Sequence, residues 1–472
     1  MHDKLKNRPY YRWLIFAVVA LGIFMSTLTS SVVDVALPQI IAGLNTDLAT
    51  VQWVVSAYLL VITSLLPLAG RLGDICGRRR IYTCGYLGFV GGSILCGYTQ
   101  SIEVLIAARI VQAAGAAALM AVGPAVLVCS FSPQERGKVL GMTGTAVALG
   151  ALTGPSLGGL LIEKFSWHAV FFVNIPVGLL GFLGSRLVVP PDNLTRKETL
   201  DYLGALLFTV GITSLLLLLS HGLQWGWENP LIKLCAFLAP AVFALFIRHE
   251  LRVTHPMLNL AIFRNWPFLA GNVAGALSFM ALFANIILLP YFLHEVLGQS
   301  PVQIGLVMSA YPLVMAFTAP FSGSLSDRIG ARVLTTGGLS ILALGLAVTA
   351  NLPAGASVGR IIAGQAVMGF GNGLFQSPNN NSVMGAMTPA NLGMAGGILA
   401  LARNFGMVSG TAVAVAIFEF RRGGVAATDA AAQTAAFLTG YHDAVTVAAG
   451  LALLAAVISL NRRGHAGAEG NG

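Results

Sequence analysis

The chain has 472 residues, of which 56% are hydrophobic and only 10% are charged, whereas about a quarter of the residues in soluble domains are charged. So few charges could not cover the surface of a soluble protein of this size, which excludes that class. The net charge of +9 does not indicate a nucleic-acid partner, because the cytoplasmic loops of membrane proteins carry excess Lys and Arg. The five cysteines show no metal-ligand spacing, and we expect free thiols and no metal site.

Fourteen apolar stretches follow one another along the chain, each about long enough to cross a bilayer. Because lipid offers no hydrogen-bond partner to the backbone, each is predicted to be a helix. The first stretch is too long for a cleaved signal peptide, so we expect a retained helix. The predicted spans are residues 13–41, 51–70, 80–98, 104–128, 138–161, 169–189, 201–220, 230–248, 266–292, 303–325, 332–350, 357–381, 393–418 and 442–461.

The distribution of Lys and Arg predicts the orientation. With the N-terminus inside, twenty of these residues lie in inner segments and only three in outer gaps, which places both termini in the cytoplasm. We expect a multi-pass protein of a bacterial cytoplasmic membrane. Two longer gaps are expected to form surface helices, an amphipathic one over 255–263 at the inner interface and an Ala- and Thr-rich one over 423–439 outside.

One segment of the chain occurs twice. Gly70–Arg79 and Gly323–Arg332 share Gly, Leu, Asp, Gly and Arg in register, and each follows the second span of a six-helix unit. Repeated halves are typical of secondary transporters. We therefore expect three regions: a six-helix bundle over 1–190, two inserted spans over 191–250, and a second six-helix bundle over 251–472.

The loop after the second span carries the first functional motif. Its glycines permit a tight turn and the close approach of two helix ends, and Asp74 is expected to cap a helix or to pair with an arginine. The alternative reading is a basic loop that only anchors the protein in the membrane.

The fifth predicted span carries the second motif, a run of small residues from Gly150 to Gly159. Small residues four apart let helices touch backbone to backbone, and Pro155 bends the helix. Ordinary helix packing is the alternative reading.

The third feature is a pair of charges inside spans. Asp34 is the acidic residue placed well inside a span, and Arg109 lies at a similar depth in span 4. Thr27 and Ser30 share the helix face of Asp34, and Gln112 lies one turn beyond Arg109. Desolvation favours a protonated Asp34, whereas a nearby arginine favours its ionised form. The pair is either a proton-binding site or a fixed ion pair between helices.

These motifs resemble one family. G-x-L-x-D-x-x-G-R-R resembles the signature loop between helices 2 and 3 of the major facilitator superfamily, with a departure at Ile75, where members often carry Arg; the second copy has Arg328 there. G-x-x-x-G-P-x-x-G-G is similar to the signature that separates antiporters from uptake symporters. Asp34–Pro38 and Arg109–Gly115 resemble helices 1 and 4 of the fourteen-helix drug:proton antiporters, the latter a motif linked to proton coupling.

The resemblance implies an all-α integral membrane fold of two six-helix bundles plus two extra helices, fourteen spans in all. It implies a proton-coupled exporter of amphipathic, cationic drugs or dyes, with Asp34 and Arg109 coupling the proton. Export of an endogenous compound such as a lysophospholipid, siderophore or amino acid is the alternative. The implied conformational residues are Gly70, Asp74, Gly77, Arg78, Gly150, Gly154, Pro155, Gly158, Gly159, Asp327 and Arg328. The implied substrate-facing residues are Thr27, Ser30, Gln52, Tyr58, Gln112, Phe171, Asn174, Asn272, Asn285, Gln365, Asn372 and Phe375.

The sequence offers little to an enzyme or a sensor. It shows no paired buried carboxylates, no His-rich metal spacing and no nucleophile motif, and it has no Walker loop for ATP. We expect no enzyme activity and no cofactor, with the proton gradient as the energy source. The expected partners are the lipid bilayer, a small amphipathic substrate and protons, and we expect a monomer.

Overall fold

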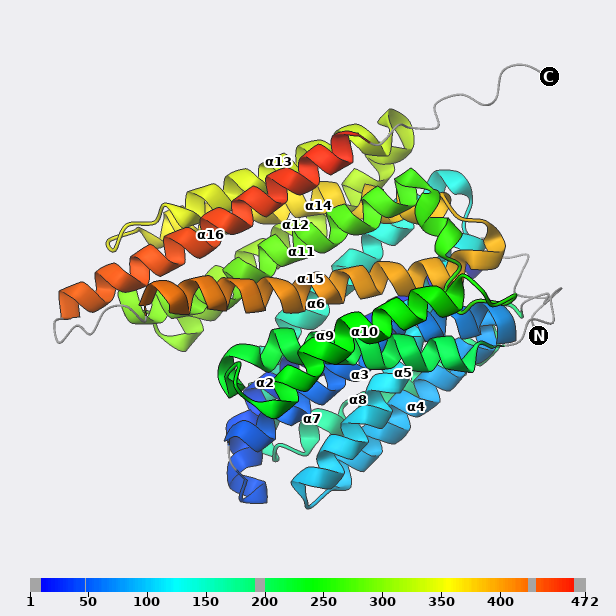
Figure 1. The fold of residues 1–472 in the computed structure, drawn as a ribbon, viewed down its shortest axis with the longest axis horizontal. Helices are drawn as coiled ribbons and strands as arrows, with labels where there is room; N and C mark the ends of the chain where they lie inside the picture. The colour runs from blue at the N-terminus through cyan, green and yellow to red at the C-terminus, as the bar shows by residue number, and fades with distance from the viewer. Residues whose placement is uncertain (1–9, 47, 192–199, 423–429, 462–472) are drawn as a thin grey trace. The chain divides into compact units, whose positions relative to one another are not determined.

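The computed structural model describes residues 10–46, 48–191, 200–422 and 430–461. In these residues the fold is all-α (Figure 1). The first group of helices is α2 (Tyr11–Leu44), α3 (Leu48–Cys76), α4 (Arg78–Tyr98), α5 (Ile102–Ser130), α6 (Pro133–Lys164), α7 (Ala169–Phe172), α8 (Asn174–Val188), α9 (Tyr202–Trp225) and α10 (Pro230–Glu250). The second is α11 (Trp266–Tyr291), α12 (Pro301–Ile329), α13 (Ala331–Ala350), α14 (Val358–Gly385), α15 (Leu392–Arg422) and α16 (Ala430–Leu460).

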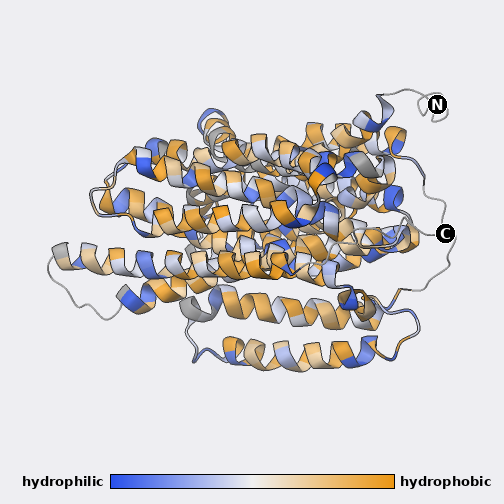
Figure 2. Cartoon of the chain, turned by 90° about the horizontal axis from the view of Figure 1, so that it is seen from above, coloured by the Kyte–Doolittle hydropathy of each residue, from blue (hydrophilic) through white to orange (hydrophobic). Residues whose placement is uncertain are grey.

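All fourteen predicted stretches are helical, and eleven of these helices are long and apolar enough to cross a membrane. Figure 2 shows hydrophobic residues predominating along the helices. The helices α4, α6 and α14 are long enough but carry more Gly, Asn, Thr or charged residues and do not meet this criterion. The protein is therefore a multi-pass membrane protein with eleven candidate spans, and the count of fourteen stays a prediction.

The predictions of two separate surface helices, over 255–263 and 423–439, were wrong. Residues 255–263 do not form a helix of their own: turns precede a short 3-10 helix at Leu260–Arg264. Pro256 explains this, because it lacks an N–H and disfavours helical geometry in the residue before it. Of 423–439, the residues from 430 onward belong to α16, since Ala is the strongest helix former and nothing interrupts the run; residues 423–429 lie outside the described residues.

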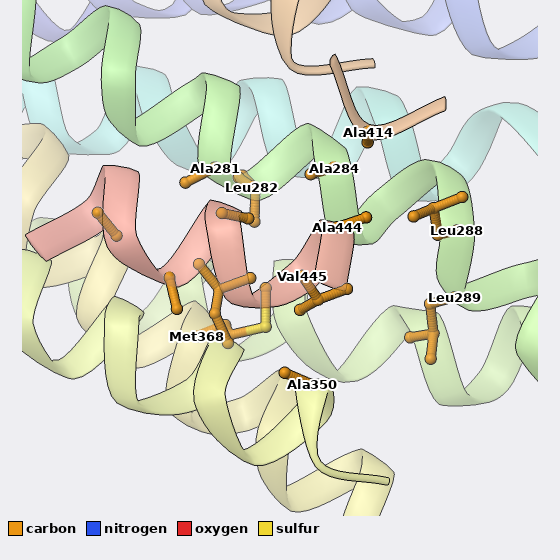
Figure 3. Packing of buried hydrophobic residues seen from close by; sticks show 14 of the residues in the cluster. Ala281, Leu282, Ala284, Leu288, Leu289, Ala350, Met368, Ala414, Ala444 and Val445 are labelled. Carbon is orange, nitrogen blue, oxygen red and sulfur yellow. The ribbon is translucent and has the colours of Figure 1, made fainter. Parts of the chain in front are cut away.

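The chain divides into two compact units. The first comprises residues 1–260 and 387–401, and the second comprises 261–386 and 402–472. In the first, α4 packs on α5, α2 on α6, and α3 on both α5 and α9. In the second, α14 packs on α12 and α13, while α16 packs on α11 and α13. Figure 3 shows part of the second unit's apolar core, with labelled side chains from α11, α13, α14, α15 and α16.

The duplication seen in the sequence extends to the backbone. The helices α3 and α12 both have 29 residues. Each is followed by one glycine with positive φ, Gly77 at 100° and Gly330 at 86°, and then directly by the next helix. Glycine is required there because other residues strongly disfavour this conformation.

The helical hairpin α9–α10 is attached to α3 by polar and aromatic contacts. The hydroxyls of Ser64 and Thr213 lie 2.9 Å apart. Near the start of α3, Trp53 stacks on His221 at 5.4 Å between ring centroids. The ring centroid of Trp225 lies 4.5 Å from that of His221. Because hydrocarbon offers no competing polar partner, the hydroxyl pair gives this contact specificity as well as packing.

Candidate functional site

Arg109 is fully buried in the first unit. It belongs to α5, an apolar helix of 29 residues that begins at Ile102 and is capped by Ser101, whose hydroxyl accepts a hydrogen bond from the N–H of Val104. Arg109 Nε donates to the carbonyl oxygen of Val54 at 3.0 Å, and Nη1 donates to Gln112 Oε1 at 2.6 Å. A guanidinium cannot be deprotonated in proteins, so these bonds hold a permanent positive charge inside a membrane span.

The surroundings of Arg109 restrain it further. Gln112 Nε2 donates to Ser93 Oγ on α4 at 2.8 Å, which fixes the amide that receives the guanidinium. The guanidinium carbon lies 4.0 Å from the centroid of the Tyr58 ring and 5.9 Å from that of Phe171. Rings at this range attract a cation through their quadrupole, so Tyr58 and Phe171 help to stabilise the charge of Arg109. Of the residues predicted from sequence, the structure brings together Arg109, Gln112, Tyr58 and Phe171.

Residue 34 lies in α2, the helix that also carries Ser31 and Val32. The side chain of Asp34 lies outside the described side chains, so its pairing with Arg109 stays a prediction. The backbone around it is held tightly: Ser31 Oγ donates to the carbonyl oxygen of Gly150 at 3.2 Å. This contact fixes α2 against α6.

The glycine motif of α6 forms this contact. A methyl group added at Gly154 would collide with Ser31, and one at Gly150 or Gly158 would press on the α2 backbone or on Val32. The three glycines therefore allow α2 and α6 to approach backbone to backbone. Gly159 has open space beside it and takes no part in this contact, and Pro155 lies outside the described side chains.

The segment Gly70–Arg80 was predicted as a loop, but only Gly77 lies outside the helices, because the residues before it end α3 and those after it begin α4. The segment is closely bound within the first unit. Asp74, whose side chain is 2% exposed, accepts hydrogen bonds from the N–H groups of Gly393 and Met394, both at 2.9 Å. Arg78 pairs with Asp74 at 3.1 Å and donates to Cys129 Sγ and to the carbonyl oxygen of Pro389. A carboxylate on the first N–H groups of a helix is favourable because those groups have no partner within the helix. Asp74 thus caps α15, and Arg78 neutralises the capping carboxylate.

Three of the remaining predicted residues of the first unit, Thr27, Ser30 and Asn174, have partners within the unit. Thr27 and Ser30 donate to carbonyl oxygens one turn earlier in α2. Asn174 accepts from the Thr29 hydroxyl at 3.0 Å and donates to the carbonyl oxygen of Val170. Gln52 is half-buried. These partners favour helix packing for Asn174 over direct contact with a substrate.

The predicted polar residues of the second unit are buried, and several have unsatisfied atoms. Among the described residues, Asn272 Oδ1, Asn285 Nδ2 and Gln365 Nε2 have no hydrogen-bond partner. Asn372 instead donates to the Tyr311 hydroxyl at 2.7 Å. Phe375 belongs to the apolar core. A buried amide atom without a partner is costly, so such atoms normally face water or a ligand.

The sequence analysis did not identify two residues of the second unit. Gln376 is buried in α14, and its Oε1 has no partner among the described residues. Arg403 is half-buried in α15, well inside a candidate span. An arginine far from both ends of an apolar run indicates function as strongly as a buried acid does, so the position of Arg403 is itself a sequence signal.

Comparisons with known proteins place this geometry in a family. Residues 19–270 and 271–462 each match the Major Facilitator Superfamily profile, so nearly the whole chain is covered by two matches. The chain belongs to the major facilitator superfamily. It is therefore a membrane-embedded transporter of small molecules and not an enzyme.

Relatives within the superfamily differ in their named substrates. The chain is 35% identical to riboflavin transporter RibZ of Clostridioides difficile over 85% of this chain and 87% of that protein. It is 33% identical to multidrug resistance protein Stp of Mycobacterium tuberculosis (strain CDC 1551 / Oshkosh), over 85% and 74%. The crystal structure of the human organic anion transporter MFSD10 (TETRAN) shares the fold at 17% identity, with a TM-score of 0.67 over 96% of this chain and 100% of that chain.

Proposed function

We propose that this major facilitator is a proton-driven exporter that works by alternating access. The observation that carries the proposal is Arg109, a permanent cation fully buried in a span and fixed by Val54 and Gln112. A fixed cation in a low-dielectric site favours the ionised form of a nearby carboxyl group. In this proposal the carboxyl group is Asp34.

The proposed cycle uses one acid. Asp34 accepts a proton while the site is open to the outside, and the neutral form persists during the conformational change. Substrate arriving from the cytoplasm displaces the proton, because Arg109 then stabilises the carboxylate. Exchange of one proton for one monovalent cation moves no net charge across the membrane.

The proposed architecture is the fourteen-helix drug:proton antiporter form. It consists of two six-helix bundles, 1–190 and 251–472, with α9 and α10 as the inserted pair and both termini in the cytoplasm. The glycine face of α6 supports the antiporter assignment, because it packs directly against α2, which carries residue 34. We propose amphipathic cationic drugs or dyes as substrates, in line with the relative named multidrug resistance protein Stp.

Everted vesicles with an imposed proton gradient test the coupling. We expect wild-type vesicles to accumulate a cationic dye and Asp34→Asn vesicles to lose gradient-driven uptake while still binding the dye. Asp443→Asn is the matched control, because Asp443 is an acid outside the proposed coupling site and pairs with Arg421 at 2.6 Å. Wild-type uptake by Asp34→Asn under the gradient contradicts the proposal.

Export of an endogenous compound is the second candidate. A specific observation favours it: Arg403 places a cation inside a span of the second unit, which suits a substrate with an anionic group, and one relative is named a riboflavin transporter. Metabolite analysis of the medium from deletion and overexpressing cells separates the two candidates. An anionic metabolite whose export requires the chain and is lost in Arg403→Gln favours the second.

A further inference from the structure

Three ionisable side chains meet at one end of the hairpin α9–α10. Asp201 caps the start of α9, and its Oδ1 accepts from the Gly204 N–H at 2.9 Å. His249 and Glu250 form the last turn of α10. His249 Nε2 lies 2.9 Å from Asp201 Oδ1 and 3.0 Å from Oδ2. This cluster has no role in the proposed proton coupling.

Glu250 is the unusual member of the cluster. It is only 5% exposed, and its Oε1 has no hydrogen-bond partner among the described residues. A methyl group at Gly204 would collide with both Glu250 Oε1 and Asp201 Oδ2. Oxygens of two carboxyl groups therefore flank the same α-carbon. A second negative charge at this place would be both desolvated and repelled.

The charge on Asp201 is already stabilised. Although partial burial raises the pKa of Asp201, hydrogen bonds from the Gly204 N–H and from His249 lower it to below its usual value. Asp201 therefore stays ionised at neutral pH. An ionised carboxylate so close disfavours a second negative charge on Glu250.

The other oxygen of Glu250 holds the segment that leaves the hairpin. Glu250 Oε2 accepts from the Leu258 N–H at 3.0 Å. Met257 and Leu258 are buried, 1% and 6% exposed. The long first stretch of the first unit ends at Leu260, so Glu250 is attached to the last part of that stretch before the chain enters the second unit.

We propose that Glu250 is a proton-binding site that controls how tightly residues 251–258 are held against α9 and α10. The groups facing it are Asp201 at the start of α9, His249 from α10 and, from the segment itself, the backbone N–H groups of Met257 and Leu258. Protonated Glu250 is neutral and keeps the segment bound. Loss of the proton places two carboxylates side by side and loosens the segment. A rise in cytoplasmic pH would therefore weaken the attachment of residues 251–258, which lead from the first unit into the second.

Hydrogen–deuterium exchange of the full-length protein in nanodiscs tests this without any transport assay. After correction for intrinsic exchange rates, we expect peptides covering 251–260 to exchange about tenfold faster at pH 8 than at pH 6. Glu250→Gln keeps the size and an acceptor oxygen but carries no charge, so its segment should stay protected at both values. Glu250→Met removes the acceptor and should leave the segment unprotected at both.

His249 is the alternative source of any pH dependence, and His249→Gln is the matched control. We expect His249→Gln to retain the difference between pH 6 and pH 8. A difference that survives in Glu250→Gln, disappears in His249→Gln, or is absent in the wild-type protein overturns the assignment. Because the readout is local protection, failure of the dye-export proposal does not affect it.

Discussion

The two copies of the loop motif have the same backbone but different surroundings. In the first copy, Asp74 and Arg78 are bound to residues 389–394. In the second copy, Arg328 is exposed, and alanine at position 331 replaces the counterpart of Arg78. Repetition of the sequence pattern therefore reproduces the helix–glycine–helix turn, whereas the side-chain partners depend on what lies beside each turn. Variants of both copies separate these two contributions.

Asp74→Asn should have the largest effect. The change removes the charge from two hydrogen bonds to backbone N–H groups, and bonds to charged groups contribute about 1.5–3 kcal/mol each. We expect a clear fall in melting temperature and near loss of transport, measured by thermal unfolding and vesicle uptake. Asp327→Asn is the comparison in the second copy, and an equal fall there would show that the two loops are equivalent after all.

Arg78→Ala should come next. It removes the partner of the buried Asp74 carboxylate and the bond to the Pro389 carbonyl oxygen, at a cost of about 2 kcal/mol. Thermal unfolding should show a smaller shift than for Asp74→Asn. The reverse change, Ala331→Arg in the second copy, should leave the melting temperature unchanged. A higher melting temperature would mean that an acceptor lies within reach of the new arginine.

Gly77→Ala and Gly330→Ala should lower the free energy of unfolding by similar amounts, about 1–2 kcal/mol each, because both glycines have positive φ. This pair isolates the backbone contribution that the two copies share. Thermal unfolding of the two variants under the same conditions is the measurement. A fall in melting temperature for only one of them would show that the two turns are not equivalent.

Arg328→Ala should have the smallest effect, with no measurable change in melting temperature, because the side chain is exposed. Ile75→Ala is its matched control in the first copy. Because the Ile75 side chain is half-buried, its truncation should lower the melting temperature more. A larger loss from Arg328→Ala would indicate a contact of Arg328 beyond those among the described residues.

Much of the fold follows from the sequence because lipid permits few backbone structures. Apolar length predicted all fourteen helices, and the repeated loop predicted the matching turns at Gly77 and Gly330. The start of α16 was missed because hydropathy does not distinguish a surface helix from the extension of a span. The prediction of a helix over 255–263 was wrong because it relied on the spacing of apolar residues and did not consider that Pro256 disfavours a helix there.

The candidate site was only partly predictable. A lone Arg109 inside a span is visible from charge and depth, but its acceptor, the Val54 carbonyl oxygen, is a backbone atom with no sequence signal. Arg403 was visible in the same way and was overlooked. Glu250 gave no signal either, because an acid at the end of a span resembles an ordinary loop charge, and only packing against Asp201 and Leu258 distinguishes it.

The attachment of α9 to α3 limits how this transporter can be shortened. Excision of the α9–α10 hairpin would leave the Ser64 hydroxyl and the Trp53 indole without the Thr213 and His221 side chains that now cover them. The shortened protein would then present a polar stripe to acyl chains. Protein engineers who trim the hairpin should therefore replace both side chains with aliphatic ones in the same step.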